Sequence, residues 1–106
     1  MRGYQLVFFT FQNMRVGRFT VGEWLLERAR ELEVPGATMS AGQSGYDSGG
    51  RFHSAHFFDL AEQPIEVLMI VTEDEAEKLF TGIEAAGLEI LYSKTPVEFG
   101  VTGKKD

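Results

Sequence analysis

His53 and His56 are the only histidines in the 106-residue chain, and their spacing is the first feature that could carry chemistry. Residues three apart share one face of a helix, where two imidazoles can hold a metal ion, but they lie on opposite faces of a strand. The chain has no cysteine, and no third ligand is evident near them. We therefore expect no metal site, and we take His53 alone as a ligand contact at the base of a loop.

That loop is the glycine-rich segment at residues 42–50, which reads Gly-Gln-Ser-Gly-Tyr-Asp-Ser-Gly-Gly. Glycines let a backbone approach a ligand closely, and successive N–H groups can surround an anion. The segment is neither a Walker A motif nor a dinucleotide fingerprint. A long loop in a small domain favours a functional role, with a plain hairpin loop as the alternative. Arg51 and Arg18 could add positive charge for a phosphate, or could be solvated loop arginines.

Enzymatic chemistry finds little support in the sequence. Ser54, His56 and Asp59 are close along the chain, but a catalytic triad is defined by geometry, and no G-x-S-x-G motif is present. The acidic run at residues 73–75 fits the first turn of a helix, where the helix dipole favours negative charge. A net charge of −6 also opposes binding to nucleic acids. We therefore expect a binding protein that is not an enzyme.

Two capping boxes predict where the helices begin. Thr20-Val21-Gly22-Glu23 and Thr72-Glu73-Asp74-Glu75 both place a threonine three residues before a glutamate. The first helix is expected over residues 21–33, ended by Pro35-Gly36, and the second is expected to end at Gly87. The second helix has a buried stripe made of Ala76, Leu79, Phe80 and Ile83.

Short apolar segments alternate with these helices and predict strands. The expected strands cover residues 6–11 with Tyr4, 37–41, 52–60, 65–71 and 88–92, with a polar loop at 12–19 and a turn at 61–64. The order β-α-β-(β)-β-α-β predicts an α+β, ferredoxin-like fold: a split βαβ with two helices on one face of an antiparallel sheet. We expect one domain over residues 1–100, with a flexible loop at 42–52 and a polar tail at 101–106.

Two of the expected strands are apolar on both faces, which predicts self-association. Val7 and Phe9 point away from Leu6 and Phe8, and Leu68 opposes its neighbours in the same way. Two helices cover only one face of the sheet, and a large bare apolar face is uncommon on a monomer. Another copy of the chain is the expected cover, with the loop or the tail as the alternative.

No apolar run approaches the ~20 residues that span a bilayer, and no secretory signal pattern opens the chain. We therefore expect a cytoplasmic protein with no insertion into the membrane.

Several segments in order resemble the DUF190 family over residues 3–100. They are residues 3–10 (Gly-Tyr-Gln-Leu-Val-Phe-Phe-Thr), 23–32, 35–38, 53–60, 63–67 and 95–100 (Thr-Pro-Val-Glu-Phe-Gly). That family is similar to the PII signalling proteins and to CutA. The resemblance implies a homotrimer with its sheets packed inside. It also implies clefts between subunits that bind an adenine nucleotide beneath the loop, which reports occupancy to a partner such as a membrane transporter or channel.

The resemblance places glycine, glycine and histidine of the family pattern at Gly42, Gly45 and His53. With Arg51, and with Arg18 at the margin, these residues are the predicted ligand site; the nucleotide is a ligand, and no cofactor is expected. Ala41 stands where the family commonly has arginine, and Asp47 where it commonly has a third glycine. Both differences disfavour a phosphate. Two alternatives therefore stay open: a CutA-like protein that binds divalent metal, and an oligomer that binds partners without a small ligand.

Overall fold

The computed structural model describes residues 1–42, 44–46, 52–54 and 63–103, with the backbone alone at 44–46 and 52–54. The elements, in chain order, are β1 (Arg2–Phe11), β2 (Arg15–Val16), β3 (Phe19–Thr20), α1 (Val21–Glu31), β4 (Gly36–Ala41), β5 (Ser44–Tyr46), β6 (Phe52–Ser54), β7 (Pro64–Thr72), α2 (Glu73–Ala85) and β8 (Leu91–Glu98). Neither of these helices is long and apolar enough to span a membrane.

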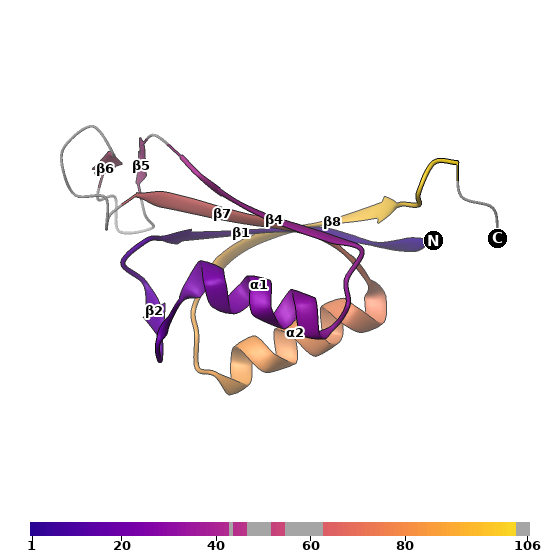
Figure 1. The fold of residues 1–106 in the computed structure, drawn as a ribbon, viewed down its shortest axis with the longest axis horizontal. Helices are drawn as coiled ribbons and strands as arrows, with labels where there is room; N and C mark the ends of the chain where they lie inside the picture. Colours follow the sequence, from indigo (N-terminus) through magenta and orange to yellow (C-terminus); the bar gives the residue numbers. More distant parts are fainter. Residues whose placement is uncertain (43, 47–51, 55–62, 104–106) are drawn as a thin grey trace.

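Four strands form one antiparallel sheet in the order β4-β7-β1-β8, and both helices lie on the same face of it (Figure 1). The two central strands, β1 and β7, are the two that the sequence predicts to be apolar on both faces. This arrangement is the ferredoxin-like α+β fold, so the predicted fold class is confirmed.

The core lies between the sheet and the helices. On β1, Leu6 and Phe8 have no exposed surface, because they point to the helices. The buried residues of β7 alternate in the same way. Facing them, the buried stripe of α1 contains Trp24, Leu25 and Ala29, and that of α2 contains Ala76, Leu79 and Ile83.

Each helix begins at its predicted capping box. The Thr20 hydroxyl accepts a hydrogen bond from the Glu23 N–H at 3.1 Å, and the Glu23 carboxylate accepts from the Thr20 N–H at 2.8 Å. That backbone hydrogen bond is the main reason why the pKa of Glu23 is lowered. Thr72 and Glu75 form the same reciprocal pair at the start of α2.

Both helices also end in the same motif, but with different residues in its left-handed position. After α2, Gly87 has a φ of 69°, and the N–H groups of Gly87 and Leu88 return to carbonyls of the last turn. After α1, Glu33 takes that position with a φ of 56°. The predicted end at Pro35-Gly36 is therefore too late, because the chain already leaves the helix at Leu32.

We expect Glu33→Gly to stabilise the protein. A side chain in left-handed geometry costs about 1–2 kcal/mol, part of which is offset because glycine is more flexible in the unfolded chain. The net gain in the free energy of unfolding should be about 0.5–1 kcal/mol by urea denaturation. Glu33→Ala removes the same carboxylate but keeps the Cβ atom, so it should give no gain. An equal gain from both variants would contradict the conformational explanation.

Two other sequence expectations are wrong in detail. The loop predicted at residues 12–19 contains the short hairpin β2–β3. The last strand is not residues 88–92 but β8, which starts at Leu91 and ends at Glu98. The apolar pattern misplaced this strand because Leu88 and Ile90 pack on the core from the connection before it, whereas β8 is an exposed edge strand with mostly polar residues.

The glycine-rich segment and the strand predicted after it are only partly described. A two-stranded ribbon of β5 and β6 occupies part of them, so the strand predicted over 52–60 is observed as β6 at 52–54. Residues 55–60 lie outside the described residues, as do 61–62 of the predicted turn. The division into a domain at 1–100 and a tail at 101–106 stays a prediction.

Candidate functional site

The predicted ligand residues begin where β4 ends, beside the start of β7. Ala41 is the last residue of β4, and the Gly42 N–H donates a hydrogen bond to the Pro64 carbonyl at 2.9 Å. This bond extends the pairing of β4 with β7 by one residue. Gly42 is therefore held against the edge of the sheet, at the point where the chain leaves it for the β5–β6 ribbon.

The ribbon brings two of the predicted residues together. Gly45 on β5 and His53 on β6 are direct cross-strand partners, flanked by the pairs Ser44–Ser54 and Tyr46–Phe52. Opposed residues in an antiparallel pair have Cα atoms about 4.5–5.5 Å apart. Gly45 adds no side chain at this position, so the backbone opposite His53 is open to a ligand. Figure 1 shows the ribbon at the end of the sheet, beyond the start of β7.

Arg18 lies in a different structure at the same end of the sheet. It sits in the turn of the β2–β3 hairpin, where its carbonyl accepts a hydrogen bond from the Arg15 guanidinium at 2.8 Å. The hairpin extends on the helix side, whereas the ribbon lies on the other side of the sheet (Figure 1). The structure therefore does not bring Arg18 together with the Gly45–His53 pair within one chain. Arg51 lies outside the described residues.

The described residues contain no group of three or more histidine, cysteine, aspartate or glutamate side chains that could hold a metal ion. His56 of the H-x-x-H pair lies outside that part of the chain. What the described geometry offers a ligand is a glycine-lined backbone beside one histidine.

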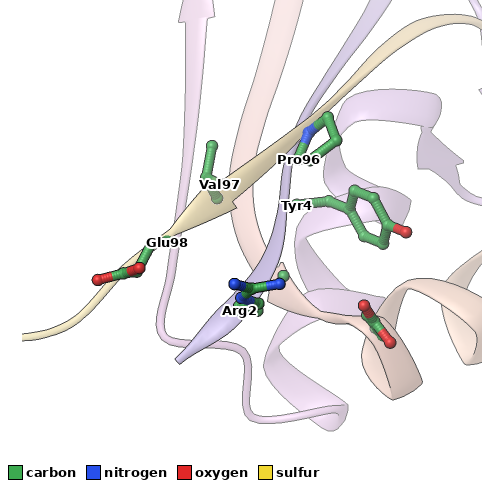
Figure 2. A pocket seen from close by; sticks show the side chains of 7 residues that line it. Arg2, Tyr4, Pro96, Val97 and Glu98 are labelled. Carbon is green, nitrogen blue, oxygen red and sulfur yellow. The ribbon is translucent and has the colours of Figure 1, made fainter.

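A separate hollow lies at the opposite end of the sheet, with a volume of about 340 Å³ (Figure 2). It is lined by Arg2, Gly3, Tyr4, Glu73, Pro96, Val97 and Glu98. Arg2 of β1 lies directly opposite Glu98 of β8, so the hollow presents charges of both signs. No predicted site residue lines it. Sequence reasoning had no signal for it, because its residues come from the first strand, the last strand and the start of α2.

Comparison with known proteins agrees with the resemblance. Residues 3–99 match the model of the DUF190 family, described as "Uncharacterized ACR, COG1993". No curated protein matches the sequence.

Several solved structures share the fold. CPII, a nitrogen regulatory PII-like protein from Thiomonas intermedia K12 bound to ADP, AMP and bicarbonate, matches with a TM-score of 0.71 and 16% identity, over 95% of this chain and 91% of CPII. A protein of Thermus thermophilus classed as PII-like matches at 0.65 and 15%, over 91% and 87%. A DUF3240 family protein from Shewanella baltica matches at 0.63 and 14%, over 98% and 100%. At these identities the likeness shows the fold alone.

Proposed function

This chain belongs to the DUF190 family, and from that premise and its PII-like fold we propose that it is a regulatory protein that binds an adenine nucleotide. The observation that carries the proposal is the match along nearly the whole chain to CPII, whose structure holds ADP and AMP. In our proposal, copies of the chain form a homotrimer, and the nucleotide binds in the clefts between them.

The proposed binding site consists of Gly42, Gly45, Arg51 and His53, with Arg18 reaching it from another copy. The register of the ribbon supports this choice, because it pairs Gly45 with His53 next to the end of β4. The hairpin and the ribbon lie on different sides of the sheet, so Arg18 contacts the nucleotide only in a cleft formed by two chains.

The sheet face away from the helices supports assembly of the chain. Phe9, Leu68 and Leu91 lie on it with 39%, 40% and 67% of their surface exposed. Val7 and Ile70 on the same face are partly exposed. We call this surface the open face. Apolar area that is in contact with water is a strong driving force for association, at about 25 cal/mol per Å² buried.

The charge of the protein favours a second copy as the cover of the open face. Each chain carries a net charge of −6, so identical copies repel one another over most of their surfaces. The described residues of the open face carry a single charged group. Copies that meet through it bury apolar area with the least repulsion.

In this proposal the protein acts in the cytoplasm by binding and not by catalysis. Nucleotide occupancy is passed through residues 42–52 to a partner protein, such as a membrane transporter or channel. Such signalling requires the nucleotide to bind one conformation of that segment more tightly than another, because only differential affinity shifts a population.

We expect His53→Ala to weaken nucleotide binding about tenfold, which is the effect of losing one hydrogen bond of about 1.5 kcal/mol to a charged ligand. Isothermal titration calorimetry with ADP and AMP measures the change, and sedimentation velocity should show an unchanged assembly. His56→Ala is the matched control and should bind like the unmodified chain. Equal affinities for all three proteins would remove His53 from the site. No heat from any protein at millimolar nucleotide would favour an oligomer that binds partners without a nucleotide.

A further inference from the structure

The open face carries one ionisable side chain among its described residues, the carboxylate of Glu66. The register of the sheet places Glu66 in the centre of a row, opposite Ser40 on β4 and Phe9 on β1, and Phe9 is in turn opposite Leu91 on β8. Glu66 is exposed in the single chain. Two of its three row neighbours are therefore large apolar side chains, and the third is a hydroxyl.

No other charge on the described part of this face lies near Glu66. The adjacent row contains Thr38, Leu68, Val7 and Ser93, and the remaining described positions of the face are apolar, hydroxyl, amide or glycine. Arg2, Lys94 and Glu98 belong to the opposite face, because they alternate with these residues along their strands. The N-terminal ammonium bonds to the Phe99 carbonyl at the other end of β1. The described face therefore provides no cation that could pair with Glu66.

Symmetry extends this argument to the assembled protein. When copies meet through the open face, each copy presents the same side chains to its neighbours. The neighbour's described face then brings apolar groups, hydroxyls and its own Glu66. A carboxylate that leaves water without a cationic partner is destabilised, and a like charge nearby destabilises it further. The neutral carboxylic acid avoids both penalties.

We infer that assembly through the open face is coupled to uptake of a proton by Glu66, so that association tightens as the pH falls. This inference rests on the proposed assembly. The sign follows from linkage: the assembled state binds more protons than the separate chains, so lowering the pH favours assembly and raising it favours dissociation. Because the proposed nucleotide clefts lie between copies, the same proton would also control how many clefts exist.

The test is sedimentation velocity of the full chain over a dilution series at about pH 5.5 and about pH 8, a range that brackets protonation of a destabilised carboxylate. We expect half-assembly of the unmodified chain to need at least a roughly tenfold higher concentration at the higher pH. Glu66→Gln keeps the shape of the side chain without its charge, and it should assemble equally well at both pH values. Glu77→Gln on the exposed side of α2 removes the same charge elsewhere and should keep the pH dependence.

The outcomes separate this inference from the assembly on which it rests. An assembled chain without pH dependence, or a Glu66→Gln variant with the pH dependence of the control, would overturn the role of Glu66 and leave the assembly in place. A chain that stays monomeric at both pH values, with and without Glu66→Gln, would overturn the assembly itself. Nucleotide binding by such a monomer would still be measured separately by calorimetry.

Discussion

Gly3→Ala is expected to cause the largest loss of stability of any change proposed for this chain. A Cβ atom on Gly3 would lie 1.9 Å from the backbone oxygen of Val71 and 2.9 Å from the ring of Phe99. The first obstacle is the main chain of the central strand β7, which no change of rotamer can move. We expect a loss of about 3 kcal/mol, at the upper end for overpacked sites, measured by urea denaturation.

Gly36→Ala is the matched control for this prediction. Gly36 also begins a strand of the same sheet, but a Cβ atom on it would meet nothing within 4 Å. Its substitution should change the free energy of unfolding by less than about 0.5 kcal/mol. Similar losses from both variants would show that glycine is needed for backbone freedom at strand starts and not for the close approach to Val71.

Leu68→Glu is expected to dissociate the assembly. Leu68 lies on the open face of β7, opposite Val7 on β1 and Thr38 on β4, and is 40% exposed in the single chain. In the proposed assembly the new carboxylate would be buried against apolar side chains and near its symmetry copies. An uncompensated buried charge is strongly unfavourable. At neutral pH the variant should therefore run as a folded monomer in size-exclusion chromatography with light scattering.

Thr81→Glu adds the same charge on the exposed side of α2, away from the open face. It should remain assembled like the unmodified chain, and both variants should keep the same circular dichroism spectrum. A Leu68→Glu variant that stays fully assembled would show that the interface lies elsewhere. Dissociation of both variants would show that net charge, and not the open face, controls assembly.

The sequence was sufficient to predict the helices and the central strands. The two capping boxes depend on pairs of residues three apart, and the structure forms both of them. The central strands were evident because both faces of β1 and β7 are apolar. β8 was misplaced because an edge strand with exposed, mostly polar residues has no apolar periodicity, and its pairing with β1 is a long-range contact.

The candidate site was only partly predictable, for a similar reason. Glycines and a histidine near a long loop could be recognised in the sequence. That Gly45 faces His53 depends on the register of the β5–β6 ribbon, which the sequence does not specify. The place of Arg18 depends on a hairpin whose two strands have two residues each, too short for a periodic pattern. The isolation of Glu66 likewise emerges only when four strands are set in register.

Native mass spectrometry in the presence of ADP tests the central claim most directly, because one spectrum reports both the number of chains and the number of nucleotides bound. The account predicts a trimer that carries up to one ADP per chain and loses it on competition with excess AMP. A monomer, or a trimer that binds no adenine nucleotide at millimolar concentration, would contradict the claim that this chain is a PII-like nucleotide-binding regulator.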